Sequence, residues 1–221
     1  MQKNEVQAAT NQIYNATVAA TYEAERGHGF LNEVEAQAWH DDLAEMIEIM
    51  SNARVLDVGS GTGVLTRLLA EWGGYVVGLD SSPDMVAEAR NRIPAHLTTK
   101  IEFQVGDTMQ DALRFPAQTF DCIASRQVVC HFVDPLQAFR NWYHWLKPNG
   151  QIIVIDGLWT KESWGDDDLT AHLPLAFIQN RATLTYLLEQ AGFLIEQCRW
   201  LERVNRFLET TEQHQRYIVI G

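Results

Sequence analysis

The chain has 221 residues, of which 46% are hydrophobic and 21% are charged, and its formal net charge is -12. This excess of acids argues against a protein that grips a long stretch of DNA or RNA, because phosphate contacts require clustered Lys and Arg. The sequence has no apolar run near the roughly 20 residues of a membrane span, and its polar start lacks the apolar core of a signal peptide. We therefore expect a cytoplasmic protein without a membrane-spanning segment.

Residues that often bind metals are not arranged as a metal site. Cys122, Cys130 and Cys198 lie far apart and include no CxxC pair, which indicates neither a disulfide framework nor a zinc site. Three consecutive carboxylates, Asp166 to Asp168, cannot all face one ion, so we interpret them as a solvated turn. The sequence therefore predicts no metal.

Helices are predicted before the first strand. Residues 6–25 carry the apolar spacing of a helix, which ends near a glycine-flanked His28. Asn32 can cap a second helix. We interpret residues 1–50 as an N-terminal helical cap and residues 51–221 as the main domain, together forming a single structural unit.

Strands and helices alternate from residue 54 onward, which is typical of a parallel α/β sheet covered by helices on both faces. The predicted strands span residues 54–57, 75–79, 101–105, 120–124, 151–155, 193–200 and 216–220. The predicted helices among them span residues 61–72, 84–92, 136–146 and 183–191. Ligands of such sheets bind at the carboxyl ends of the strands, so we expect the residues there to form one site.

The strongest motif follows the first of these strands. The stretch Val55–Gly63 reads VLDVGSGTG and leads directly into an apolar helical pattern. Glycines at alternate positions let the backbone approach a ligand closely at a helix N-terminus. Acids recur near the ends of later strands, at Asp80, Asp107 and Asp156. Such carboxylates can accept hydrogen bonds from the hydroxyls or amines of a ligand.

In this motif and in the later strand ends, the chain resembles the class I S-adenosylmethionine-dependent methyltransferases, whose first motif reads (V/L)LD(V/L)G(C/S)G(T/S)G. The resemblance implies a Rossmann-like sheet of seven strands, the last of them antiparallel. It also implies S-adenosyl-L-methionine as methyl donor and S-adenosyl-L-homocysteine as product. By this resemblance, Asp80 would bind the ribose hydroxyls and Asp107 the adenine amino group. Met85 and Thr108 would lie along the adenine ring.

The resemblance implies further cofactor contacts around this core. Residues at the end of the fourth strand would lie beside the sulfonium, and aromatic residues of the cap would close over the methionine carboxylate. These further residues come from the glycine loop, the strand ends and the cap: Asp57, Gly59, Ser60, Gly61, Gly63, Ser81, Gly106, Ser125, Arg126, Gln127, Tyr14 and Tyr22.

A nucleotide-dependent oxidoreductase is one alternative, because its fingerprint also joins a glycine loop to an acid about 20 residues later. That fingerprint reads GxGxxG, whereas this loop has Val64 and no further glycine after Gly63. Asp57 would also repel a pyrophosphate. The second alternative is a binding or scaffolding protein that keeps the fold without the chemistry, which the intact loop and acids disfavour.

The methyl acceptor is expected to be a small molecule, because the chain is short and acidic. Residues 125–128 also lack the (N/D)PP(Y/F) box that DNA and glutamine methyltransferases share. Oxygen is slightly favoured over nitrogen as the acceptor atom, and carbon comes third. His131 is the candidate catalytic base, with packing as its alternative role. His28, Asp156 and Trp159 are candidate substrate contacts. For His28 an exposed loop position is the favoured alternative, and for Trp159 simple packing is an equal one.

Overall fold

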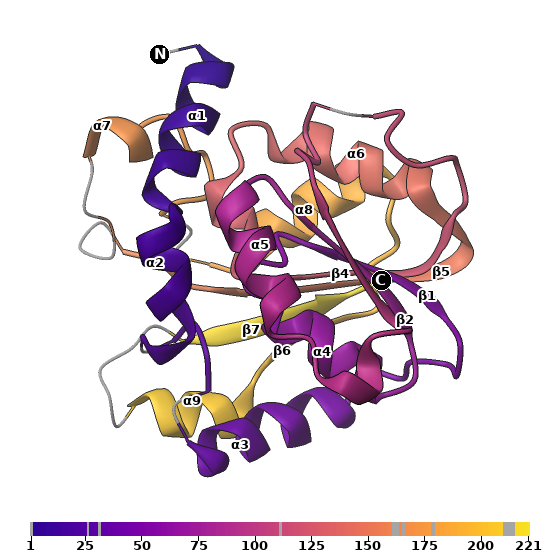
Figure 1. The fold of residues 1–221 in the computed structure, drawn as a ribbon. Coiled ribbons are helices and arrows are strands. Elements are labelled where there is room, and N and C mark those ends of the chain that lie inside the picture. Colours follow the sequence, from indigo (N-terminus) through magenta and orange to yellow (C-terminus); the bar gives the residue numbers. More distant parts are fainter. Residues whose placement is uncertain are drawn as a thin grey trace.

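Seven strands form one sheet at the centre of the computed structural model, which describes residues 2–25, 27–30, 32–110, 112–160, 164, 167–177, 180–209 and 215–221 (Figure 1). The strands are β1 (Arg54–Val58), β2 (Tyr75–Asp80), β3 (Ile101–Val105), β4 (Phe120–Arg126), β5 (Leu146–Gly157), β6 (Gln197–Trp200) and β7 (Arg216–Ile220). Their order across the sheet is β3-β2-β1-β4-β5-β7-β6. The pairs among β1 to β5 are parallel, and β7 is antiparallel to both of its neighbours. The predicted seven-stranded sheet with an antiparallel last strand is confirmed.

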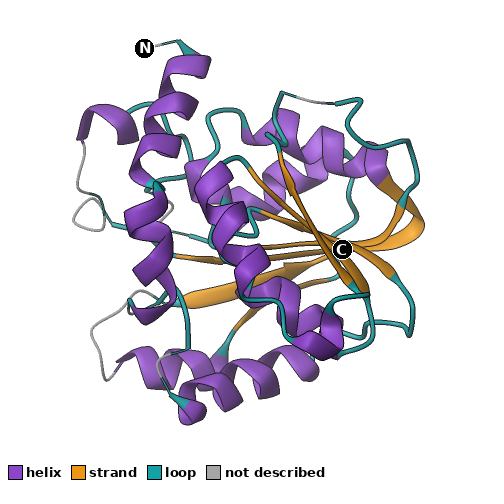
Figure 2. Cartoon of the chain, in the orientation of Figure 1, coloured by secondary structure: helices purple, strands orange, loops and turns teal. Residues whose placement is uncertain are grey.

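Helices cover both faces of this sheet. They are α1 (Lys3–Ile13), α2 (Ala16–Thr21), α3 (Glu33–Ala44), α4 (Val64–Glu71), α5 (Pro83–Asn91), α6 (Pro135–Trp145), α7 (Asp167–Thr170), α8 (Ala182–Ala191) and α9 (Glu202–Glu209), with short 3-10 turns η1 (Tyr22–Ala24), η2 (Ala95–Leu97) and η3 (Val129–His131). In Figure 1, α6 and α8 lie on one side of the sheet, and α3, α4 and α9 lie on the other. Figure 2 shows the strands as one layer between these helices. No helix in the described part of the chain is long and apolar enough to cross a bilayer.

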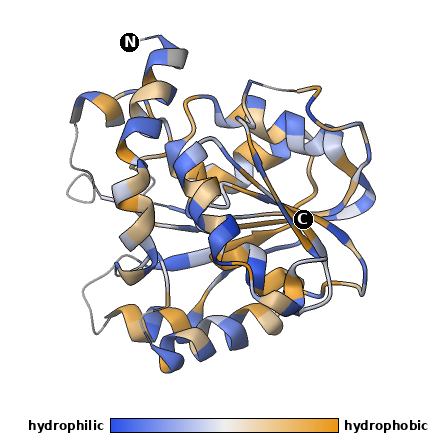
Figure 3. Ribbon diagram, in the orientation of Figure 1, coloured by the Kyte–Doolittle hydropathy of each residue, from blue (hydrophilic) through white to orange (hydrophobic). Residues whose placement is uncertain are grey.

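Successive side chains of a strand point to opposite faces of the sheet, so they pack into two separate hydrophobic cores. In β1, Leu56 packs with Trp142 of α6 on one face, whereas Val55 packs with Leu69 of α4 and Trp39 of α3 on the other. Figure 3 shows the matching hydrophobic colour along the strands and on parts of the helices. Burying a side chain of this size contributes roughly 1.5–3 kcal/mol, so these two cores hold the sheet in place.

The register of the parallel strands brings their carboxyl ends to one edge of the sheet. Val58 of β1 pairs with Leu79 of β2 and with Ser125 of β4. Asp80, the last residue of β2, pairs with Val105, the last residue of β3. The segments that follow these four strands therefore leave the sheet side by side, as the predicted site requires.

The N-terminal helices α1 and α3 pack in two different parts of the structure. Val6 of α1 packs with Leu169 of α7 and with Leu173, away from the two sheet cores. By contrast, Trp39 and Leu43 of α3 belong to the core beneath the sheet. The helix predicted over 6–25 is interrupted, because Oδ1 of Asn15 accepts hydrogen bonds from the backbone amides that begin α2.

The sequence prediction was wrong in leaving residues 201–215 without an element. Helix α9 follows β6. Its residues Val204 and Leu208 are buried, and so is Leu201 just before it. Oδ2 of Asp42 accepts hydrogen bonds from the backbone nitrogens of Arg203 and Val204, at 2.8 and 3.0 Å. The cap of α9 therefore comes from a residue in α3, so its own neighbourhood in the sequence carries no capping signal.

Other predicted boundaries shift by a few residues. Strand β4 continues to Arg126, and β5 begins at Leu146, so the turn predicted before β5 is part of that strand. Of the three carboxylates predicted to form a turn, Asp166 lies outside the described residues, and Asp167 and Asp168 begin α7.

Candidate functional site

The loop after β1 presents its backbone, rather than side chains, at the edge of the sheet. Gly61 has a φ of +52°, and a Cβ atom placed there would lie 3.8 Å from the ring of Tyr22, its nearest neighbour. Oδ2 of Asp80 accepts a hydrogen bond from the nitrogen of Gly61 at 2.8 Å, and Oδ1 accepts one from the nitrogen of Ser82 at 2.9 Å. Because each carboxylate oxygen has a further lone pair, Asp80 can fix this loop and still bind a ligand.

Gly63, the last glycine of the motif, has a packing role in this structure. It is the N-cap residue just before α4, with a φ of +89°, and a Cβ there would lie 2.7 Å from the ring of Phe103. Gly63 is not among the residues that line the cavity described next. Its glycine is therefore explained by backbone conformation and by the approach of Phe103.

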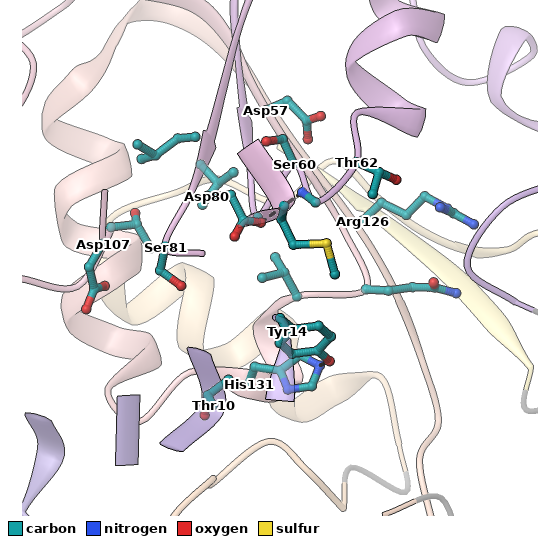
Figure 4. A pocket seen from close by; sticks show the side chains of 18 of the residues that line it. Thr10, Tyr14, Asp57, Ser60, Thr62, Asp80, Ser81, Asp107, Arg126 and His131 are labelled. Carbon is teal, nitrogen blue, oxygen red and sulfur yellow. Dashed lines mark hydrogen bonds between the residues drawn. The ribbon is translucent and has the colours of Figure 1, made fainter. Parts of the chain in front are cut away.

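A cavity lies over the carboxyl ends of β1, β2 and β3, and we call it the strand-end cavity (Figure 4). The structure brings together most of the predicted site residues around it. Those that line it are Tyr14, Tyr22, His28, Asp57, Gly59, Ser60, Gly61, Asp80, Ser81, Met85, Gly106, Asp107, Thr108, Arg126, Gln127 and His131.

Several buried polar atoms around the strand-end cavity have no hydrogen-bond partner in the described part of the chain. They are Oδ1 of Asp57, Oγ of Ser60, Oγ1 of Thr62, Oδ2 of Asp107 and Nε2 of Gln127. Leaving a buried polar atom unpaired costs about 1–3 kcal/mol, so native proteins seldom tolerate several together. The carboxylates can accept and the amide and hydroxyls can donate, so this set fits a ligand with both kinds of polar group.

Three carboxyl groups give the cavity its electrostatic character. Burial raises the pKa of Asp57 to about 7, although the hydroxyl of Thr66, 2.5 Å away, opposes the shift. Burial also raises the pKa of Asp80 and of Asp107, against the backbone amides that donate to them. A nearby cation favours the ionised form of such groups, so the cavity suits a positively charged ligand.

Helix α1 is held over the cavity by contacts with the residues that follow β2. Oγ of Ser82 donates to the carbonyl oxygen of Tyr14 at 2.6 Å, and Oγ of Ser81 donates to Oδ1 of Asn11 at 2.8 Å. Nε2 of Gln7 donates to Oγ of Ser81 at 3.1 Å. The sequence analysis includes Tyr14 among the site residues but not the side-chain amides of Gln7 and Asn11. Their spacing of four residues, on the helix face that also carries Tyr14, was the available signal.

Tyr14 and His131 are in direct contact. The hydroxyl of Tyr14 lies 3.2 Å from Nε2 of His131, and the two rings are nearly perpendicular at 89°. Burial lowers the pKa of His131 to about 4, and His28 adds to this shift. Burial also raises the pKa of Tyr14 well above its usual value. Both groups are therefore neutral at pH 7, and either one can donate to the other, depending on the tautomer of the imidazole.

A second cavity adjoins the first, with a volume of about 430 Å³, and we call it the aromatic cavity. Its lining residues are Thr10, Ile13, Tyr14, Val18, Tyr22, Glu25, His28, Gln127, Cys130, His131, Trp159, Trp164, Leu169 and Thr170. It shares with the strand-end cavity the residues Thr10, Tyr14, Tyr22, His28, Gln127 and His131. The Tyr14–His131 contact is therefore part of the wall between the two spaces.

Of the predicted substrate contacts Asp156, near the end of β5, and Trp159, just after it, only Trp159 lines the aromatic cavity. Asp156 is buried, and its Oδ1 accepts a hydrogen bond from Nε1 of Trp159 at 2.6 Å. Burial raises the pKa of Asp156 to about 6. The guanidinium of Arg216 lies 4.6 Å from the centre of the Trp159 ring. Asp156 and Arg216 therefore hold the indole in place from behind the cavity wall.

The end of β4 contributes less to the cavities than the resemblance implies. Ser125 is fully buried and lines neither cavity. Arg126 lines the strand-end cavity, but its guanidinium donates to the carbonyl oxygens of His28 at 2.8 Å and of Gly27 at 3.3 Å. The same group lies 4.5 Å from the centre of the Trp39 ring. Arg126 therefore anchors the turn that carries His28.

Comparison with known proteins shows what this chain is similar to. Residues 56–154 match a family model described as a methyltransferase domain. Phosphoethanolamine N-methyltransferase 3 of Arabidopsis thaliana is 32% identical over 147 residues, which cover 66% of this chain and 29% of that protein. Demethylmenaquinone methyltransferase of Tropheryma whipplei (strain Twist) is 33% identical over 151 residues, covering 67% and 59%. The chain thus spans less than two thirds of the length of either curated relative.

Solved structures agree at the level of the fold. A SAM-dependent methyltransferase from Aquifex aeolicus superposes with a TM-score of 0.68 at 17% identity, covering 93% of this chain and 97% of that one. Phosphoethanolamine N-methyltransferase 2 of Haemonchus contortus, in complex with S-adenosyl-L-methionine, gives 0.67 at 19% identity, covering 94% and 57%. The family match identifies residues 56–154 as a methyltransferase domain, and the chain as a whole has the fold of the S-adenosylmethionine-dependent methyltransferase with which it superposes.

Proposed function

We propose that this chain binds S-adenosylmethionine in the strand-end cavity and transfers its methyl group to an oxygen or nitrogen atom of a small molecule held in the aromatic cavity. The observation that carries the proposal is the set of buried, unpartnered polar atoms around the strand-end cavity, which also holds three carboxyl groups. When bound, the cofactor supplies a methyl group already activated by a sulfonium. The positive charge of that group matches the acidic lining.

Two carboxylates are proposed to select the adenosine part of the cofactor. Asp80 suits a vicinal diol, because each of its oxygens keeps one lone pair beyond the backbone amide that it already binds. Asp107 is proposed to accept from the adenine amino group. Its Oδ1 is engaged by the backbone nitrogen of Met109 at 2.8 Å, and its Oδ2 has no partner among the described residues. Met85, whose side chain is buried, is proposed to cover the adenine ring.

The wall between the cavities is where the acceptor atom is proposed to lie. Methyl transfer depends mainly on alignment of the acceptor and on exclusion of water. Tyr14 and His131 line both cavities, and His131 is neutral at pH 7, so its imidazole can accept a proton from an acceptor hydroxyl or amine. The hydroxyl of Tyr14 is proposed to orient that imidazole through their 3.2 Å contact.

The names of the two curated relatives support a small-molecule acceptor. Those proteins are named for phosphoethanolamine in Arabidopsis thaliana and for demethylmenaquinone in Tropheryma whipplei. Both are small molecules, and the chemistry differs between them, so the names support the class of acceptor without choosing one.

A labelled-methyl assay tests this proposal. The purified chain is incubated with tritiated S-adenosylmethionine and a small-molecule extract, and label is counted in the small-molecule fraction. We expect transfer by the unaltered chain and by Asp84→Ala, an exposed change on α5, and at least a tenfold loss in Asp107→Ala. Binding of S-adenosylmethionine without transfer to any fraction would instead support a non-catalytic binding protein.

A further inference from the structure

We propose that the methyl acceptor is an amine without a phosphate group, recognised in its ammonium form by the rings of the aromatic cavity and by the carboxylate of Glu25. This inference rests on the proposed function, because it takes the aromatic cavity as the acceptor site. It selects nitrogen as the acceptor atom, which sequence reasoning had placed second.

The rings of the cavity meet at steep angles. The ring centres of Tyr22 and Tyr14 lie 6.0 Å apart, with an angle of 80° between the ring planes. The ring centres of Tyr14 and His131 lie 5.6 Å apart, with an angle of 89°. His131 and Trp164 continue the series, 5.0 Å apart at 71°. Successive rings that stand nearly perpendicular form corners, so together they wall a space from several directions.

His28 extends this wall on one side. Its ring stacks on Tyr22 with centres 4.1 Å apart and an angle of 7°. Burial lowers the pKa of His28, as it does that of His131, so neither imidazole adds a positive charge at neutral pH. A wall of neutral rings attracts a cation, because ring faces carry negative charge density, and quaternary and methylated ammonium groups are bound in such cages.

The charged residues around the cavity point to the same ligand. Glu25 is the acid among the described lining residues, and none of them is Lys or Arg. Its side chain is 54% exposed, with an oxygen 3.5 Å from Nδ1 of His28, so it lies at the rim, where an incoming cation meets it. Phosphate groups are recognised chiefly by Arg and Lys. Arg126, on the neighbouring cavity, is already engaged by two carbonyl oxygens.

The transfer balances for such an acceptor. The bound ammonium first releases one proton to solvent. The freed nitrogen lone pair then forms the new bond to the methyl carbon, the bond between that carbon and sulfur breaks, and its electron pair stays on sulfur. The positive charge therefore moves from sulfur to the product nitrogen, which remains inside the ring wall.

Calorimetric binding tests the inference without depending on turnover. The protein is saturated with S-adenosylhomocysteine and titrated with 2-phenylethylammonium, its neutral isostere 2-phenylethanol, and phosphoethanolamine. We expect the ammonium to bind at least fivefold more tightly than either of the other two. In Glu25→Gln its affinity should fall about fivefold, while the affinity for 2-phenylethanol and for S-adenosylhomocysteine should not change. The matched control is Glu48→Gln, because Glu48 is an exposed glutamate outside the set of residues that line the cavity.

The result that overturns the inference is tighter binding of phosphoethanolamine or of the neutral alcohol, or an ammonium affinity that Glu25→Gln leaves unchanged. The S-adenosylhomocysteine titration separates this failure from failure of the proposed function. If S-adenosylhomocysteine binds and the ammonium does not, only the acceptor assignment is wrong. If S-adenosylhomocysteine itself does not bind, the proposed function fails, and the acceptor assignment fails with it.

Discussion

The hydroxyl of Tyr14 lies 3.2 Å from Nε2 of His131, although the two residues are separated by 117 positions in the chain. Tyr14 follows α1, which lies over the site, and His131 ends the turn after β4. Their contact ties the N-terminal helix to the sheet edge and stands between the strand-end cavity and the aromatic cavity. We therefore expect this pair to matter both for closure of the site and for its chemistry.

Tyr14→Phe tests the catalytic importance of the contact. The change keeps the ring and removes the hydroxyl that orients His131, so we expect kcat to fall by about 10²-fold, in the range of a lost general acid–base arrangement. Affinity for S-adenosylhomocysteine should change by less than threefold. Steady-state kinetics and calorimetry measure the two effects. Tyr186→Phe, on an exposed tyrosine of α8, should leave both unchanged, and an unaltered kcat in Tyr14→Phe would remove the pair from the mechanism.

The depressed pKa of His131 predicts a pH dependence of stability. Its folded pKa of about 4 lies below the unfolded value of 6.5, so the fold favours the neutral imidazole. This contribution is fully present above pH 6.5 and is lost as the pH falls toward 4, amounting to about 3 kcal/mol. The buried acids Asp57 and Asp156 shift in the opposite direction, so stability must be compared between matched proteins.

His131→Gln supplies that comparison, because it leaves both acids in place. Urea unfolding at pH 7, 5.5 and 4.5 should show the native chain losing stability relative to His131→Gln as the pH falls. A difference between the two proteins that stays constant across this range would show that His131 is not held neutral by the fold.

Arg126→Met tests the anchor of the turn at residues 27–30. Methionine can keep the contact with Trp39 but cannot donate to the carbonyl oxygens of Gly27 and His28. We expect amide hydrogen exchange in this turn to become at least tenfold faster, since hydrogen bonds to a charged group contribute about 1.5–3 kcal/mol. Mass spectrometry of peptides over this region measures the change. Arg199→Met, on the exposed face of β6, is the control, and equal exchange in both variants would refute the anchoring role.

Asp42→Ala tests the remote cap of α9. The side chain of Asp42 is 3% exposed, accepts from two backbone amides of α9 and pairs with the guanidinium of Arg203 at 3.0 Å. Its loss leaves buried donors unpaired, so we expect the free energy of unfolding to fall by about 2–3 kcal/mol. Asp41→Ala, at the adjacent position of α3, where Oδ1 accepts a hydrogen bond from Nε2 of Gln37, should cost less than 1 kcal/mol. Equal losses in the two variants would contradict the capping account.

Most of the fold could be predicted from the sequence because its signals are local. Strands β1, β2 and β3 follow apolar runs, and each ends beside a glycine or an acid, as in Val55–Gly63 and at Asp80. Helix α9 could not be predicted in the same way, because Asp42 caps it from a distant helix. Only the spacing of Leu201, Val204 and Leu208 signalled it.

The site also has one part that local sequence signals predict and another part that they do not. The residues of the strand-end cavity were found because a parallel sheet brings its carboxyl ends together. The Tyr14–His131 contact, the anchoring of the turn by Arg126 and the hold of Asp156 on Trp159 depend on segments that meet only in the folded chain. No local pattern encodes such contacts.

The most direct test of the central claim is calorimetric binding of S-adenosylmethionine to the native chain and to Asp80→Ala, with Asp84→Ala as control. Asp80 fixes the glycine loop through Gly61 and is proposed to bind the ribose. We expect the unaltered chain and Asp84→Ala to bind S-adenosylmethionine, and Asp80→Ala to bind it at least 30-fold more weakly. No binding by the native chain at millimolar cofactor, or full affinity in Asp80→Ala, would contradict this claim.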